Sequence, residues 1–166
     1  MTSTVTKRII AGKDGSFSCP ECGAILSDVR SVPAHRAFFG FIKHVFDNWP
    51  ETNDEFQPDN PEHLRAYLLV RSGHCMPEHV FRFASKREQR IVEGFVTEEM
   101  RVDRARGIYG WLTIKDGGLV VVRPASIAFD KISQKKMNQV CENVFRVIYE
   151  LTGIDFTKWK EMGPSA

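Results

Sequence analysis

Apolar residues recur at three- and four-residue steps in four segments of this chain, a spacing that predicts amphipathic helices. The first helix follows Pro33 and ends at the "NWP" stretch of 48–50, where proline disfavours helical geometry in the preceding residue. The other three are expected over 61–73, about 86–106 and 133–153. In the third helix the pattern places five side chains inside the protein: Ile91, Val92, Phe95, Val96 and Met100.

Local signals support the helix ends and predict the strands between them. Asn60 stands where a helix N-cap belongs, with Pro61 at the first helical position, and Gly153 follows the last helix. The runs "IYGWLTI" and "LVVVRP" flank "KDGG", which predicts a hairpin with a tight turn and positive backbone angles. "HVFRF" at 79–83 alternates as a strand does. Phe156 and Trp159 are expected to pack on the body of the protein.

The order of these elements predicts an α+β fold, with a small antiparallel sheet packed with about four helices. Residues 1–32 are expected to form a separate small β unit, an N-terminal Cys-containing β-hairpin. Residues 33–166 are expected to form the main α+β domain.

Composition and charge narrow the function classes. The hydrophobic content of 42% suits a folded protein rather than a disordered one. The 23 basic and 21 acidic residues leave a formal net charge of +2, so a nucleic-acid site must come from local clustering. The N-terminus reads as neither a signal peptide nor a membrane anchor, and no apolar run reaches the roughly 20 residues that cross a bilayer. A cytoplasmic location, with reduced thiols and no membrane partner, is the expectation.

Cys19 and Cys22 flank a Pro-Glu pair and are followed by glycine, a turn that suits zinc thiolates. A structural Zn2+ site needs four ligands, and no second pair of this kind exists. The candidate partners are in "GHCMPEH": His74, Cys75 and His79. A zinc site and a hairpin turn with two reduced thiols are the two main interpretations. A redox pair is less favoured, because thiol oxidoreductases place the first cysteine at a helix N-terminus and "GAIL" reads as a strand.

Basic residues cluster in the second half of the chain, with two aromatic residues just beyond them. Such a mixture suits nucleic acid, because cations meet phosphates and rings stack on bases. Glutamates interleave with these cations, so an ordinary solvated surface is the competing interpretation. The candidate nucleic-acid contacts are Arg82, Lys86, Arg87, Arg90, Arg101, Arg104, Arg106, Tyr109 and Trp111. No catalytic constellation is visible, so no catalytic residue is named.

From "AHRAFFGFIKHVFDNWPE" onward the chain resembles uncharacterised early-region proteins of tailed phages and prophages. The resemblance includes "PEHLRAYLLVRSGH" and "RPASIAFDKISQKKMNQV", covers about residues 33–160, and leaves out the cysteine turn. These proteins are loosely similar to the lambda Orf-type recombination accessory proteins.

The resemblance implies a phage-encoded, non-catalytic accessory protein of DNA metabolism in the host cytoplasm. Its partner would be single-stranded or double-stranded DNA or a nucleoprotein complex. One alternative is an inhibitor that binds a host protein of a defence system, and another is a metal-dependent nuclease. A phage protein partner and an oligomer are also compatible with the sequence.

Overall fold

The computed structural model describes residues 10–11, 17–18, 25–26, 32–53, 55–77, 79–128 and 131–163, with side chains from Val32 onward. Its helices and antiparallel sheet confirm the predicted α+β class. Three two-residue strands, β1 (Ile10–Ala11), β2 (Phe17–Ser18) and β3 (Ile25–Leu26), pair antiparallel near the N-terminus. The cysteine turn lies outside the described residues, and the boundary at residue 32 stays a prediction.

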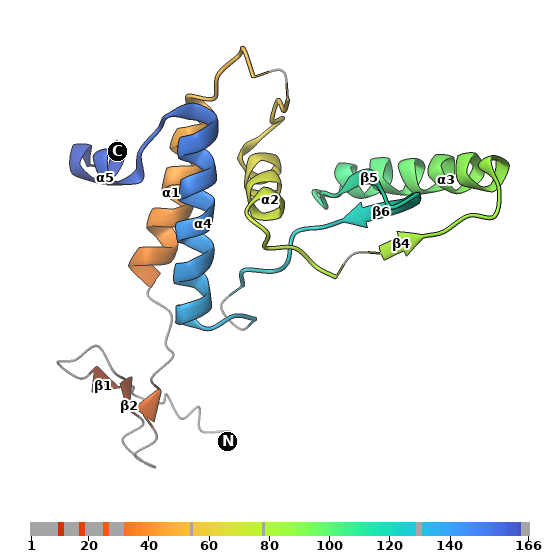
Figure 1. The fold of residues 1–166 in the computed structure, drawn as a ribbon. Coiled ribbons are helices and arrows are strands. Elements are labelled where there is room, and N and C mark those ends of the chain that lie inside the picture. Colours follow the sequence, from red (N-terminus) through yellow and green to blue (C-terminus); the bar gives the residue numbers. More distant parts are fainter. Residues whose placement is uncertain are drawn as a thin grey trace, which may run out of the picture.

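Four helices form what we call the helical half: α1 (Val32–Asp47), α2 (Pro61–Arg71), α4 (Gln134–Thr152) and α5 (Phe156–Met162). α1, α2 and α4 lie side by side, and α5 packs on the side of α1 that faces away from α2 (Figure 1). Their apolar faces meet in one core in which Phe41, Leu68 and Val144 are fully buried. Trp159 is 7% exposed and packs against Phe41, with tilted rings whose centroids are 5.3 Å apart, so the predicted packing of the tail is confirmed.

The sheet half consists of β4 (His79–Phe81), α3 (Lys86–Ala105), β5 (Trp111–Lys115) and β6 (Gly118–Val122). The strand order is β4-β6-β5, all antiparallel, and α3 lies across one face of the sheet (Figure 1). Asp116 and Gly117 turn the β5–β6 hairpin with φ angles of 51° and 71°, which confirms the predicted tight turn.

Two extended segments connect the halves and pair with each other. The Met76 N–H donates to the Arg123 carbonyl at 2.8 Å, and the Ala125 N–H donates to the His74 carbonyl at 3.1 Å. An isolated bridge joins Cys75 to Pro124 between them. The sheet half is therefore held beside α2 by paired backbone, with its other end reaching away from the helices (Figure 1).

Most helix ends follow the sequence signals. Asn60, Ser133 and Asp155 each accept a backbone N–H of the first turn, and Gly153 adopts φ 72° after α4. In the described ranges no helix is long and apolar enough to span a membrane.

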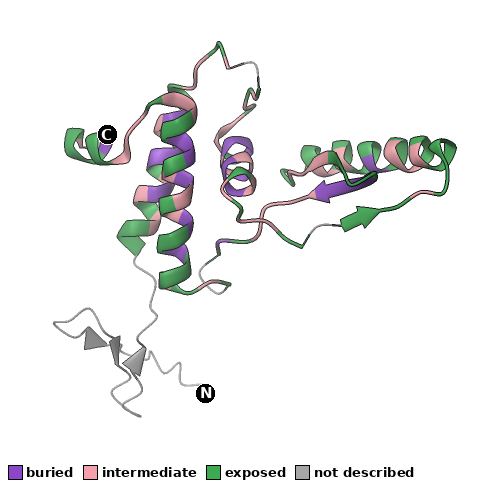
Figure 2. Ribbon diagram, viewed as in Figure 1, coloured by how far each residue is buried: buried purple, intermediate pink, exposed green. Residues whose placement is uncertain are grey.

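The predicted interior of α3 needs a correction. Val96 is buried, and Val92 and Met100 are half-buried, but Ile91 is 62% exposed and Phe95 is 71% exposed. The physical reason is the width of the layer that α3 covers. A sheet of three strands can bury one stripe of the helix, and most of α3 is exposed or half-buried (Figure 2). The helix carries more apolar positions than that stripe holds.

Candidate nucleic-acid interface

The predicted contact residues separate into two groups in the structure. Arg82, Lys86, Arg87 and Arg90 lie together where β4 turns into α3, and we call them the cationic corner. Arg101, Arg104 and Arg106 lie three to five turns further along α3, toward the helical half. The single basic face that the sequence suggested is thus divided between the two ends of one helix.

Local chemistry fixes the backbone of the cationic corner. The Ser85 hydroxyl accepts the Glu88 N–H at 3.2 Å, and the Glu88 carboxylate in turn accepts the Ala84 N–H at 2.9 Å. This pair is a variant of the capping box, in which the Glu88 side chain bonds the residue before the N-cap Ser85, and it fixes the start of the helix. Glu88 is the nearest carboxylate in sequence, and its Oε2 is engaged with the backbone.

The four cations of the corner are solvent-exposed and unpaired. Each is exposed, and within the part of the chain that the structure describes none of their side chains makes an ion pair or a hydrogen bond. The corner therefore offers all four charges to solvent or to a ligand.

Their position strengthens the local positive potential. The N-terminus of a helix carries a partial positive charge, so the cations Lys86 and Arg87 in the first turn are unfavourable by about 0.3–1 kcal/mol each. Lys86 and Arg90 are also a like-charge pair at i and i+4, which costs a few tenths of a kcal/mol more. A bound anion would relieve these repulsions.

The second group of arginines is mostly neutralised. Arg101 donates to both carboxylate oxygens of Glu98, at 2.8 and 2.7 Å, and this interaction lowers the Glu98 pKa. Arg104 donates to the carboxylate of Asp59, through Nε at 3.0 Å and also through Nη2. Arg106 follows α3 and is exposed.

Tyr109 and Trp111 lie in the seam between the two halves rather than beside the cationic corner. The ring of Tyr109 stacks on His63, and its hydroxyl accepts from Asn60 Nδ2 at 2.9 Å. The ring centroid of Trp111 lies 6.1 Å from that of His63. Both aromatic residues are half-buried, and they line a pocket of about 380 Å3 together with Arg101 and Arg104.

Sequence reasoning missed the exposed apolar side chains beside the corner. Ile91 and Phe95 project from α3, one and two turns beyond Arg87. The signal was present in the sequence, because α3 has apolar residues at 91, 92, 95, 96, 100 and 102, more than one narrow stripe requires. A second pocket, of about 310 Å3, opens nearby between β4 and α3 and is lined by Phe81, Val96 and Val121.

The candidate zinc ligands are only partly described. Cys19 and Cys22 lie outside the described residues. His74 has its Nε2 3.5 Å from the Ser126 carbonyl, and burial lowers its pKa, whereas His79 is exposed on β4. Across the described ranges no three His, Cys, Asp or Glu side chains come together as a metal site.

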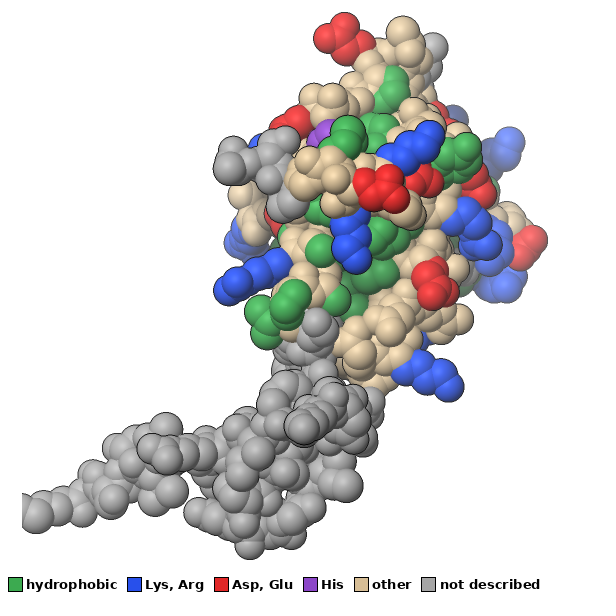
Figure 3. Space-filling model, turned by 90° about the vertical axis from the view of Figure 1, so that its left-hand side faces the viewer, with side chains coloured by type: hydrophobic (Ala, Val, Ile, Leu, Met, Phe, Trp, Pro, Cys, Tyr) green, Lys and Arg blue, Asp and Glu red, His purple; other side chains and the backbone are tan. Residues whose placement is uncertain are grey.

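The opposite end of the molecule carries a mixed surface. On the face around α5, basic and acidic side chains alternate with apolar ones, and no large patch of one sign is seen there (Figure 3). Comparisons with protein-family models, with curated proteins and with solved structures found no match to this chain.

Proposed function

We propose that this protein binds nucleic acid without catalysis, through the phosphates, as an accessory protein of DNA metabolism. The observation that carries the proposal is the cationic corner: four unpaired, exposed cations within nine positions of the chain, gathered at the start of one helix. Phosphate backbones supply closely spaced negative charges, and each phosphate that is neutralised releases a condensed counterion.

The corner suits a polyanion better than a single small anion. Four cationic side chains extend from a short segment, whereas the Glu88 carboxylate accepts a backbone N–H. A long side chain that is free to reorient can follow a flexible phosphate chain. The other two arginines within α3, Arg101 and Arg104, are held by Glu98 and Asp59, so the unpaired cations of this helix are those of the corner.

The test replaces charges without changing the core. Arg87 and Arg90 are both exposed, so the double variant Arg87→Gln/Arg90→Gln should fold normally. Its affinity for a fluorescent oligonucleotide is expected to fall about tenfold at low salt, because two of about four phosphate contacts are lost. The matched control is Lys158→Gln/Lys160→Gln on α5, two exposed cations on the mixed surface, and it should bind as the wild type does. Equal affinity of both variants would refute the proposal.

A second function is favoured by a different observation. Met76, Val80, Phe81, Ile91 and Phe95 are exposed apolar side chains on β4, α3 and the segment before β4. Exposed apolar surface of this kind also suits a protein partner, such as a component of a host defence system. The further alternative, a metal-dependent nuclease, is tested separately by incubating the protein with DNA and Mg2+ and looking for cleavage.

A further inference from the structure

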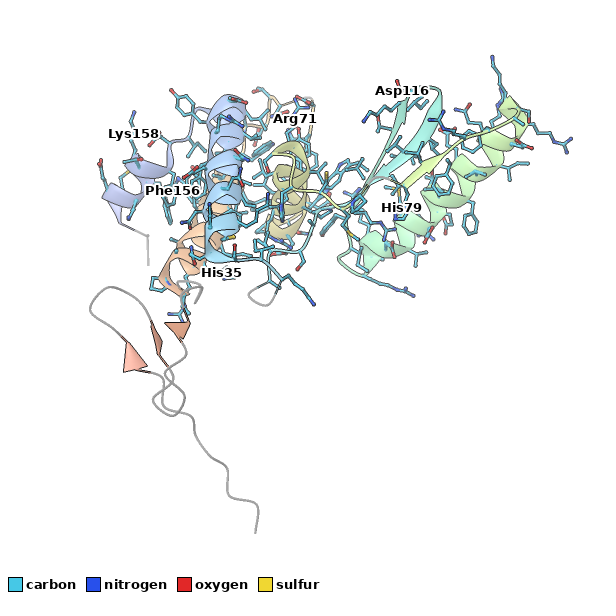
Figure 4. All side chains as sticks on the ribbon, turned by 60° about the horizontal axis from the view of Figure 1, so that its bottom comes forward. His35, Arg71, His79, Asp116, Phe156 and Lys158 are labelled. Carbon is cyan, nitrogen blue, oxygen red and sulfur yellow. The ribbon has the colours of Figure 1, made fainter. Side chains whose placement is uncertain are left out.

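One side of α3 carries a row of three side chains that begins in the cationic corner. Arg87, Ile91 and Phe95 follow one another at four-residue intervals, so they lie one above the other along the helix. With a rise of 1.5 Å per residue, the row extends about 12 Å from Arg87 to Phe95. Figure 4 shows side chains of α3 projecting away from the sheet into open space.

The row does not serve the packing of the fold. Phe95 is 71% exposed and Ile91 is 62% exposed, whereas Val96 is only 4% exposed and supplies the buried contact of α3. An aromatic ring so exposed has a free face to which a flat partner can bind.

A glycine leaves the helix bare beside the ring. A Cβ added at Gly94 would meet nothing within 4 Å, so no neighbour within the described residues requires a glycine at this position. Glycine weakens the middle of a helix. It also lets another molecule approach the backbone closely, next to Phe95.

The charged residues around the row indicate which kind of ligand would bind there. The cations Arg87 and Arg90 adjoin the apolar row on its N-terminal side, and Glu99 follows Phe95 one turn later. An anionic chain would therefore place its phosphates toward the corner and an apolar, flat group over Phe95. A nucleotide strand has this combination, and about 12 Å corresponds to three or four stacked nucleotides.

We infer, resting on the proposed function, that the ligand is single-stranded nucleic acid, with a base stacked on Phe95 and its phosphates held by Arg87 and Arg90. A duplex hides the faces of its bases, so a ring on a convex helix has nothing to stack on. Single strands expose those faces, and stacking on an aromatic side chain tolerates every base. Phe95 thus has the base-stacking role that was expected of Tyr109 and Trp111 from the sequence.

The experiment compares three fluorescent ligands of equal length and charge per strand: single-stranded DNA, a DNA duplex and an abasic single strand. Wild-type protein should bind the single strand more tightly than the abasic strand or the duplex. Phe95→Ala should lower single-strand affinity by about 5- to 150-fold and leave abasic-strand affinity unchanged. Phe95→Trp should retain single-strand binding, and Phe95→Leu, which keeps the apolar bulk without a ring, should not.

The control is Ile114→Ala, which truncates a residue that is 63% exposed on β5, and should bind as the wild type does. Thermal unfolding checks that each variant folds. If Phe95→Ala leaves single-strand affinity unchanged while Arg87→Gln/Arg90→Gln lowers it, the stacking inference is overturned and the proposed function stands. Retained single-strand binding in Phe95→Leu also overturns it, because apolar bulk without an aromatic ring would then be enough for binding. If the wild-type protein binds none of the three ligands, the proposed function itself is overturned.

Discussion

The ring of His63 stacks on the ring of Tyr109, with centroids 4.7 Å apart and planes 16° apart. His63 belongs to α2 and Tyr109 precedes β5, so this contact joins the helical half to the sheet half. His63 is 6% exposed, and its Nδ1 accepts the backbone N–H of Asp59 at 3.2 Å. In this neutral form the ring packs at the seam between the two halves, where Asp59 Oδ2 also lies 3.2 Å from His63 Nδ1.

Protonation of His63 is expected to weaken the seam. Burial, together with the charge of Arg104, lowers the His63 pKa below 6.5, and the Asp59 carboxylate opposes this shift. As pH falls through 6.5, the unfolded chain gains a proton that the folded ring does not accept, so stability falls. The free energy of unfolding, measured with urea, should decrease between pH 7.5 and pH 5.5.

The variant His63→Gln should lose part of that pH dependence. The remainder is assigned to His74, whose pKa burial also lowers, and His79→Gln is the control because His79 is exposed on β4. If His63→Gln and the wild type lose stability equally between pH 7.5 and pH 5.5, His63 is not the titrating group.

Arg123, directly after β6, forms an ion pair with Asp103 of α3. Arg123 Nη2 lies 2.7 Å from Asp103 Oδ2, and the Asp103 side chain is only 16% exposed. Asp103→Asn should lower the free energy of unfolding by about 1–3 kcal/mol, because a half-buried guanidinium loses its charged partner. Asp47→Asn is the control, since the Lys43–Asp47 pair is exposed and should contribute at most about 0.5 kcal/mol. Equal effects in urea unfolding would contradict this account of the pair.

Two glycines should respond to alanine in opposite directions. Gly94 lies inside α3 with open space around it, so Gly94→Ala should stabilise the protein by about 0.5–1 kcal/mol. Gly153 ends α4 with φ 72°, where an alanine is strained, so Gly153→Ala should destabilise it by about 1 kcal/mol. Thermal unfolding checks both signs. A destabilised Gly94→Ala variant would mean that the glycine has a packing role in the fold.

The elements whose signals are local could be predicted from the sequence. Asn60 with Pro61 marked the start of α2, and the Asp-Gly pair marked the β5–β6 turn, because caps and tight turns depend on a few adjacent residues. The face of α3 that is buried could not be predicted. That depends on how many strands lie beneath the helix, and periodicity alone cannot supply the width of a sheet.

The candidate site was predicted in part. The cations Arg82 to Arg90 are adjacent in sequence, so their clustering followed from the chain itself. The neutralisation of Arg104 did not, because its partner Asp59 lies 45 positions away. Tyr109 and Trp111 were assigned to the surface because they follow basic residues in the sequence. In the structure both contact His63 of α2, and a contact between such distant segments could not be predicted from the neighbouring residues.

The salt dependence of wild-type binding to single-stranded DNA tests the central claim most directly. With about four phosphates neutralised by the cationic corner, log K should fall with log salt concentration at a slope of about −3, which is roughly a 50-fold loss of affinity between 50 and 200 mM salt. In Arg87→Gln/Arg90→Gln the slope should become shallower by about 1 to 2. No binding at 50 mM salt, or binding whose affinity does not change with salt, would contradict the account.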